Sequence, residues 1–174
     1  MKKIKIDDLI AKKNREKIVM ITAYDALFAR LFDEFADMIL IGDSLNMSFG
    51  GSSETLGISV DEMIYHAKAV ERGAKRAFFF FFMPFGSAIT PKIALKNAVK
   101  IYKNTCCDAV KIEGGKEMAK TISLLNQNGI AVIAHIGLKP QLSRQEGGYK
   151  VAGRDEKAAQ SIIEDALALE KAGA

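Results

Sequence analysis

Short apolar runs alternate along this chain with longer amphipathic stretches. Their length, with enrichment in β-branched or aromatic residues, is typical of buried strands. The pattern predicts strands at 18–22, 38–41, 77–82, 109–113 and 130–135. The stretches between and after them have apolar residues at helical spacing, which predicts helices at about 26–34, 59–72, 91–104, 117–128 and 156–171. This repeated strand–helix alternation predicts an α/β protein with a parallel sheet and crossover helices.

The start and end of one helix have their own sequence signals. Ser59 is followed three residues later by Glu62, which is the capping-box pattern at a helix N-terminus. Gly73 comes where the same helix should stop. We therefore expect this helix to run from about residue 59 to residue 72.

Two features favour a closed (β/α)8 TIM barrel over an open doubly wound sheet. Polar or glycine residues stand at the carboxyl ends of the strands, where barrel enzymes place their chemistry: Tyr24, Asp25, Asp43, Ser44, Glu113, Gly114, Gly115 and His135. No GxGxxG turn follows the first strand, so a dinucleotide-binding sheet is unsupported. A full barrel needs about 250 residues. We expect 1–174 to be a single domain, the N-terminal portion of a barrel truncated after about five β/α units.

Composition and charge exclude several other classes of protein. The chain is 49% hydrophobic and 26% charged, and its net charge of +4 is spread without a block of five like charges. Nucleic acid is therefore not an expected partner. The basic start is not followed by the long apolar run of a secretory signal or membrane span, so we expect a cytoplasmic protein. The adjacent Cys106 and Cys107 lack metal-type spacing and are expected to be buried or half-buried free thiols.

The strand ends carry the residues with the clearest chemical potential. Asp43 and Ser44 directly follow the second strand, where a carboxylate can bind a hard cation; the alternative is a simple turn or helix start. Lys111 and Glu113 lie two apart on the fourth strand and so share one face, which is costly to bury without a partner or ligand. The alternative is a structural ion pair. His135 ends the fifth strand and lines the site or is a core residue.

The segment 78–82 consists of five consecutive phenylalanines. Such a run predicts a fully buried strand, because it would promote aggregation if it were exposed. Five rings on a strand that faces both the barrel interior and the helix layer should be crowded.

Eight short motifs, taken in order, resemble those of the ketopantoate (3-methyl-2-oxobutanoate) hydroxymethyltransferase family. They are Thr22-Ala-Tyr-Asp25, Ile41-Gly-Asp-Ser-Leu45, Asp61-Glu-Met-Ile-Tyr-His66, Arg72-Gly-Ala74, Met83-Pro-Phe-Gly-Ser87, Ala109-Val-Lys-Ile-Glu-Gly-Gly115, His135-Ile-Gly-Leu138 and Gly147-Gly-Tyr-Lys-Val151. Each motif alone would be weak, whereas eight in the family's order are specific.

The resemblance implies a (β/α)8 barrel in a homo-oligomer, often a decamer, that acts in pantothenate biosynthesis. It implies Mg²⁺-dependent transfer of a hydroxymethyl group from 5,10-methylenetetrahydrofolate to 3-methyl-2-oxobutanoate, which gives 2-dehydropantoate. By the same resemblance Asp43 and Glu113 bind the metal, and Asp43, Ser44 and Lys111 bind the substrate. A metal ion on an α-keto acid would stabilise the enolate that attacks the one-carbon unit.

The chain departs from the family's pattern at two places. The family has a metal-binding aspartate just before Met-Pro-Phe, where this chain has Phe82. Its general base is a glutamate on a strand that would lie beyond residue 174, so no catalytic base is expected within this chain. The chain as written is therefore expected to bind metal poorly and to be inactive.

Two other interpretations remain open at the level of sequence. One is another Mg²⁺-dependent enolate enzyme of the phosphoenolpyruvate mutase or isocitrate lyase kind, although the Lys-Cys-Gly loop motif of those enzymes is not found. The other is a non-catalytic, truncated copy that only folds or associates.

Overall fold

The computed structural model describes residues 2–174, which form one five-stranded sheet with helices packed around it. The strands are β1 (Met20–Thr22), β2 (Met38–Ile41), β3 (Phe78–Phe82), β4 (Ala109–Glu113) and β5 (Val132–His135). The α-helices are α1 (Ile6–Ile10), α2 (Ala26–Asp33), α3 (Leu45–Ser48), α4 (Val60–Gly73), α5 (Pro91–Asn104), α6 (Ala119–Gln127), α7 (Ser143–Glu146) and α8 (Glu156–Lys171). Two 3₁₀ turns, η1 (Lys116–Met118) and η2 (Pro140–Leu142), complete the elements.

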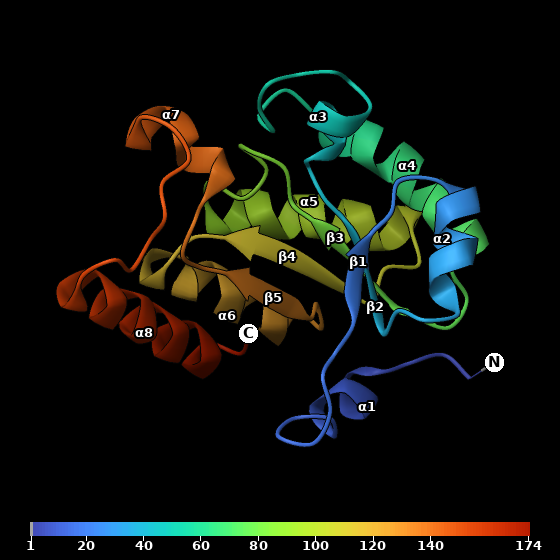
Figure 1. Cartoon of the computed structure of the whole chain (residues 1–174), viewed down its shortest axis with the longest axis horizontal. Coiled ribbons are helices and arrows are strands. Elements are labelled where there is room, and N and C mark those ends of the chain that lie inside the picture. The colour runs from blue at the N-terminus through green and yellow to red at the C-terminus, as the bar shows by residue number, and fades with distance from the viewer. Residues whose placement is uncertain (1) are drawn as a thin grey trace.

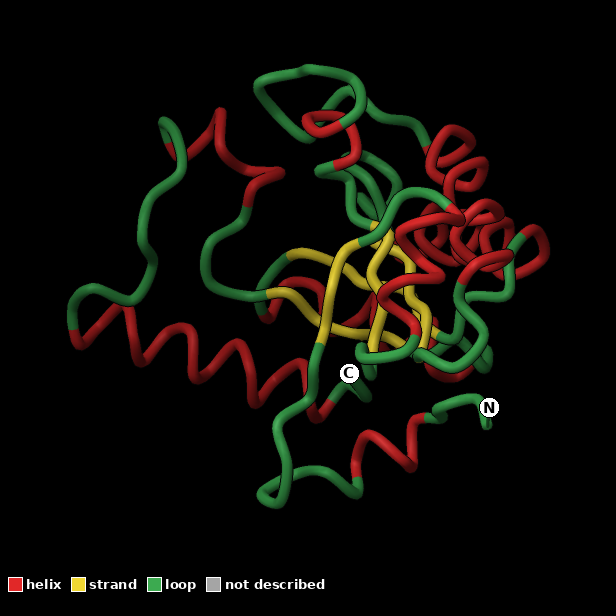
Figure 2. The backbone as a smooth tube through the Cα atoms, turned by 45° about the vertical axis from the view of Figure 1, so that its right-hand side comes forward, coloured by secondary structure: helices red, strands yellow, loops and turns green. Residues whose placement is uncertain are grey.

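The strands follow one another across the sheet in chain order, and every neighbouring pair is parallel. Parallel neighbours need a crossover, and the helices between successive strands supply it. The strands occupy the middle of the molecule, with α5 and α6 behind them and α2 to one side (Figure 1). Figure 2 shows the strands turning progressively against one another, as in a segment of a barrel wall. The expected α/β class with barrel-type strand order is confirmed. Within residues 2–174, no helix is long and apolar enough to span a membrane.

The phenylalanine strand is the centre of the core. All five rings of β3 are buried, with at most 3% of any residue exposed. Small neighbours relieve the crowding expected from the sequence: Phe80 pairs across the sheet with Ala109, and the helices behind the sheet present buried alanines at 67, 94 and 98. The prediction of a fully buried strand is confirmed.

Two stretches that lie outside the expected strands and helices contain a turn of helix. The stretch 138–154 includes η2 and α7, and the glycine- and serine-rich stretch after β2 includes α3. The helix expected at 117–128 begins as the 3₁₀ turn η1. One-turn helices are too short for a hydrophobic repeat, so the pattern gave no sign of them. The expectation for the cysteines was wrong for Cys106, which is exposed because it lies on the turn before β4, whereas Cys107 is buried; both are free thiols.

Helices α2 and α4 pack tightly against each other at Gly73, the last residue of α4. A Cβ built on Gly73 would lie 2.3 Å from the Ala26 carbonyl oxygen and 2.9 Å from the Ala29 Cβ atom. The Ser59–Glu62 capping box predicted at the start of α4 is present. Gly73 therefore ends the helix and also lets it pack against α2.

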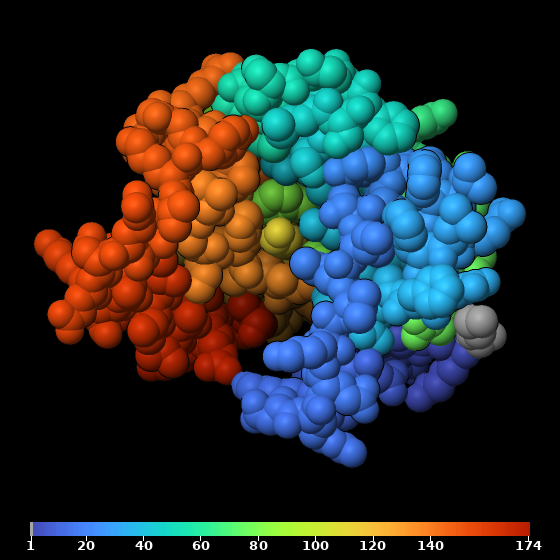
Figure 3. Space-filling view, in the orientation of Figure 1, coloured from blue at the N-terminus to red at the C-terminus, as the bar shows by residue number. Residues whose placement is uncertain are grey.

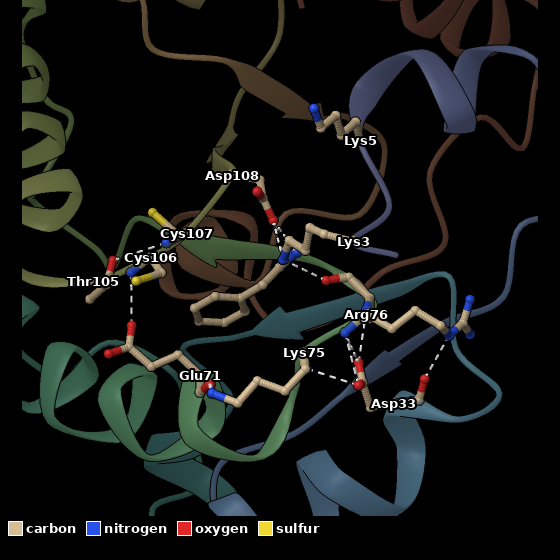
Figure 4. A network of polar contacts seen from close by, with 12 residues as sticks. Lys3, Lys5, Asp33, Glu71, Lys75, Arg76, Thr105, Cys106, Cys107 and Asp108 are labelled. Carbon is tan, nitrogen blue, oxygen red and sulfur yellow. Dashed lines mark hydrogen bonds and ion pairs between the residues drawn. The ribbon is translucent and has the colours of Figure 1, made fainter. Parts of the chain in front are cut away.

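A polar network closes the amino ends of the central strands (Figure 4). The buried carboxylate of Asp33 accepts hydrogen bonds from the backbone N–H groups of residues 75–77, just before β3. Arg76 donates back to the Asp33 carbonyl oxygen at 2.9 Å. Lys3 lies 2.8 Å from Asp108 and donates to the Ala77 carbonyl oxygen, which ties the N-terminal segment to β4 and β3. This end of the sheet is thus occupied by structural contacts, and the opposite end is left for chemistry.

Candidate functional site

The carboxyl ends of the strands bring the predicted residues together. Asp43 follows β2 by two residues, Glu113 ends β4, and Glu113 is in register with His135 at the end of β5. Strand alternation buries Val110 and Ile112 on the helix side and turns the charged side chains of β4 to the other face, as expected. A hollow on this face, between the N-terminal and C-terminal parts of the chain, has atoms of the β3–β4 region at its floor (Figure 3).

Gln141, in η2, connects the two acidic residues. Its side-chain Nε2 donates to Asp43 Oδ2 at 2.8 Å and to the Met83 carbonyl oxygen at 3.0 Å. Its backbone N–H donates to Glu113 Oε1 at 2.9 Å. One residue from a distant loop therefore contacts both carboxylates predicted to bind metal.

Lys111 has no carboxylate partner within ion-pair distance among residues 2–174, so the alternative of a Lys111–Glu113 structural ion pair is not what the fold forms. Its Nζ atom lies 4.7 Å from the centre of the Phe82 ring, which is a cation–π distance. The same ring is 5.7 Å from the ring of His135. Phe82 thus lies next to both Lys111 and His135.

Burial and charge shift the protonation equilibria of two site residues. Asp43 is only 3% exposed. Burial, helped by the negative charge of Glu113, raises the pKa of Asp43 to about 6, although the Gln141 hydrogen bond and Lys111 oppose the shift. Burial lowers the pKa of Lys111, against the attraction of Asp43 and Glu113. The site is therefore a low-dielectric one in which a bound charge would interact strongly with the protein.

Two buried polar atoms of the site lack a hydrogen-bond partner among the described residues, Glu113 Oε2 and His135 Nδ1. They lie 3.3 Å apart, within ion-pair distance but with poor hydrogen-bond geometry. The Glu113 side chain is only 2% exposed. Buried polar atoms without partners are rare because they lose their hydration without compensation. This pair is thus the place where a bound polar group would be most favourable.

Ser44 is held on the other side of Asp43. Its hydroxyl oxygen is 2.7 Å from the Tyr24 hydroxyl, and the Tyr24 carbonyl oxygen is 2.8 Å from Nδ1 of His66. His66 thus makes an internal contact from the face of α4. Asp25 is structural, because it caps α2 by accepting from two backbone N–H groups.

A cavity of about 180 Å³ opens beside Glu113 and Gln141, and Asp43 is not part of its lining. Its lining includes Met83, Phe85, Ile112, Glu113, Met118 and Gln141. Gln141 and this cavity were missed from the sequence, because no local pattern marks a loop glutamine that crosses to another strand end. Within the part of the chain that the structure describes, no cluster of three or more His, Cys, Asp or Glu side chains is arranged to hold a metal ion.

Sequence comparison places residues 3–174 on the model of one family, described as ketopantoate hydroxymethyltransferase. A 3-methyl-2-oxobutanoate hydroxymethyltransferase of Campylobacter fetus is 73% identical over 174 residues, which is all of this chain and 66% of that protein. The enzyme of the same name from Wolinella succinogenes is 59% identical over 99% of this chain and 66% of its own length. This chain thus spans slightly less than two thirds of these relatives.

Solved structures with the same fold are more distant in sequence. A phosphonopyruvate hydrolase matches all of this chain and 61% of its own with a TM-score of 0.72 at 15% identity. A phosphoenolpyruvate phosphomutase from Streptomyces platensis subsp. rosaceus matches 95% of this chain and 60% of its own with a TM-score of 0.67 at 17% identity. At this identity the likeness shows the fold and not the activity.

Proposed function

The chain belongs to the ketopantoate hydroxymethyltransferase family, and from this we propose that it carries the substrate-binding part of a 3-methyl-2-oxobutanoate hydroxymethyltransferase site. In this proposal residues 1–174 form the N-terminal portion of a (β/α)8 barrel, in a cytoplasmic homo-oligomer of the pantothenate pathway. The observation that carries it is Lys111, a half-buried cation at the mouth of the sheet that has no carboxylate partner among residues 2–174.

Lys111 suits the carboxylate of a small 2-oxo acid. An ammonium group with reduced hydration, held by strand β4, gains more from an incoming anion than an exposed lysine does. Ser44, positioned by Tyr24, offers a hydroxyl to the same ligand. Asp43 lies beside them and would contact the substrate at its keto end. These residues bind and orient the substrate, which aligns its reactive carbon for the transfer.

The metal requirement of the family fits this chain poorly. Asp43 and Glu113 supply oxygen ligands of the kind that Mg²⁺ prefers, but Phe82 supplies none, and Gln141 already donates to both carboxylates. We propose that this chain binds Mg²⁺ weakly for that reason. Mg²⁺ remains the ion to test, since a phosphonopyruvate hydrolase of the same fold was solved with oxalate and Mg²⁺.

The remaining chemistry needs groups that residues 1–174 do not supply in this proposal. A general base would remove a proton from the carbon next to the keto group, and that carbon would then form a bond to the one-carbon unit of 5,10-methylenetetrahydrofolate. The two C–N bonds between that unit and folate would break in the overall reaction, water would supply the hydroxyl group, and tetrahydrofolate would leave. The base is a glutamate from a later strand. His135, next to Glu113, lines the site and is not assigned a proton-transfer step.

Calorimetric titration of this chain with 3-methyl-2-oxobutanoate tests the substrate-binding assignment. Lys111→Met should weaken binding about tenfold or more, because the substrate carboxylate loses its cation. Lys100→Met is the matched control, since Lys100 is a surface lysine paired with Asp61, and it should leave binding unchanged. Equal affinity for the neutral ketone 3-methyl-2-butanone, or no effect of Lys111→Met, would overturn the assignment.

Activity is tested in a longer chain. Residues 1–174 with Phe82→Asp, joined to the unmatched part of the Campylobacter fetus enzyme, should form ketopantoate from 3-methyl-2-oxobutanoate, 5,10-methylenetetrahydrofolate and Mg²⁺. The same fusion with Phe82 retained should be much slower. If the Phe82→Asp fusion folds but forms no ketopantoate, the proposed reaction is wrong.

A further inference from the structure

The segment between β5 and α8, residues 137–153, crosses the end of the sheet that carries the candidate site. It contains η2 and α7 and begins and ends at glycines in the left-handed region, Gly137 with φ 85° and Gly153 with φ 72°. Glycine adopts this conformation without steric cost. In Figure 1 the segment rises at the same end of the sheet as α3, and in Figure 3 its atoms meet those of the α3 region above the hollow.

The contacts that hold this segment down are of two kinds. The outer contact is an ion pair of the exposed Arg144 with Glu54, in which Nε donates to Oε2 at 2.9 Å. The inner contact is Gln141, which reaches Asp43, Met83 and Glu113 at once. An exposed ion pair contributes little because water competes with it, whereas hydrogen bonds to buried carboxylates are strong.

We propose that Gln141 is a positioning residue that fastens segment 137–153 over the strand ends and holds the carboxylates of Asp43 and Glu113 in place. The inner contact, and not the Arg144–Glu54 pair, then sets how often the segment opens. A ligand of Asp43 Oδ2 would compete with this contact, so the order of the segment and the orientation of the two carboxylates are linked. The inference concerns the fold of this chain and does not depend on the proposed reaction.

Limited trypsin digestion of the folded chain measures segment opening directly. Arg144 and Lys150 lie inside the segment, so trypsin cleavage after either of them reports on its opening. Lys139 is followed by proline, and trypsin cleaves such a bond poorly. Gln141→Leu removes the side-chain donor and should speed this cleavage about tenfold to a hundredfold, because local opening limits proteolysis under native conditions. Gln127→Leu is the matched control, since Gln127 is exposed on α6 and donates only to Ser123. It should change the rate less than about twofold, as should Glu54→Gln, since the outer ion pair contributes little.

A double-mutant cycle separates positioning from a general loss of stability. Asp43→Leu removes the acceptor and should speed cleavage about as much as Gln141→Leu, while Asp43→Asn keeps an acceptor oxygen and should stay near wild type. The double variant Gln141→Leu with Asp43→Leu should be no faster than either single one, because both remove the same interaction. Additive effects, or equally faster cleavage at sites throughout the chain, would overturn the proposal. If Gln141→Leu does not fold, equal cleavage of Asp43→Leu and Asp43→Asn would overturn it as well.

Discussion

Replacing Phe82 by aspartate should produce a site that Mg²⁺ stabilises. Phe82 is 3% exposed and pairs with Lys111 on the neighbouring strand, and its ring faces the site. An aspartate there would point to the same face as Glu113 and join Asp43 at the strand ends. Three buried carboxylates repel one another, and an oxygen-seeking divalent cation removes that repulsion by binding between them.

The change in stability has two parts: the loss of the buried Phe82 ring, and the stabilisation that a bound Mg²⁺ ion gives to the folded state. Losing a buried phenylalanine ring costs roughly 3–5 kcal/mol, and the added carboxylate is buried near like charges, so Phe82→Asp should be clearly less stable than wild type without metal. Mg²⁺ at a hundred times its dissociation constant would return about 2.7 kcal/mol. For a domain of this size that corresponds to a rise of about 5–10 °C in the melting temperature.

Thermal unfolding with and without saturating MgCl₂, at constant ionic strength, measures this rise. Phe81→Asp is the matched control, because the adjacent residue is 0% exposed and alternation turns it to the opposite face of β3. It should be destabilised with no Mg²⁺ response, and wild type should respond by less than about 1 °C. A flat Mg²⁺ response of Phe82→Asp, or an equal response of Phe81→Asp, would refute the placement of the site.

Two further predictions test the scaffold. Burial raises the pKa of Asp33, but three backbone N–H groups outweigh it and hold that pKa below its ordinary value of 3.8. Since the folded-state pKa is the lower one, the stabilisation exists above the unfolded pKa and is lost as pH falls through the folded pKa. Asp33→Asn should therefore cost about 2 kcal/mol or more near neutral pH and progressively less as the pH falls below about 4 in urea unfolding; a cost independent of pH would contradict this. Gly73→Ala should cost about 1–3 kcal/mol by overpacking despite alanine's better helix propensity, whereas Gly57→Ala, which meets only the Asn46 side chain, should be nearly neutral by the same unfolding assay.

The sequence predicted the elements that have a long hydrophobic repeat or a strongly apolar composition. The helices at 91–104 and 156–171 and the strand at 109–113 have the bounds found in the structure. Their limits are set by local signals, such as Thr90 and Asp155 at the N-caps. One-turn helices such as α3 and α7 were missed because tertiary contacts, and not a periodic pattern, stabilise them.

The residues of the candidate site also differ in whether a local sequence signal marked them. Alternation along β4 was enough to place Lys111 and Glu113 on one face. Position after a strand left Asp43 as either a cation ligand or part of a simple turn, and the family resemblance favoured the first. The role of Gln141 had no such signal, since it depends on the path of a loop that returns across three strand ends. The roles of these residues in binding remain predictions for the experiments above.

If Asp43 and Glu113 bind a cation as proposed, position 82 is where stability and metal binding compete in this fold. The central strand β3 is flanked on both sides by strands and is fully buried, so a phenylalanine at its end extends the core up to the site. A carboxylate at the same place is unfavourable until a cation binds it, which is the usual conflict between a stable core and a binding site. In this chain Lys111 lies over the Phe82 ring, and Gln141 donates to the two carboxylates that a cation would otherwise organise. The Mg²⁺ response of Phe82→Asp therefore measures whether a carboxylate in place of the buried ring lets the proposed site bind a cation.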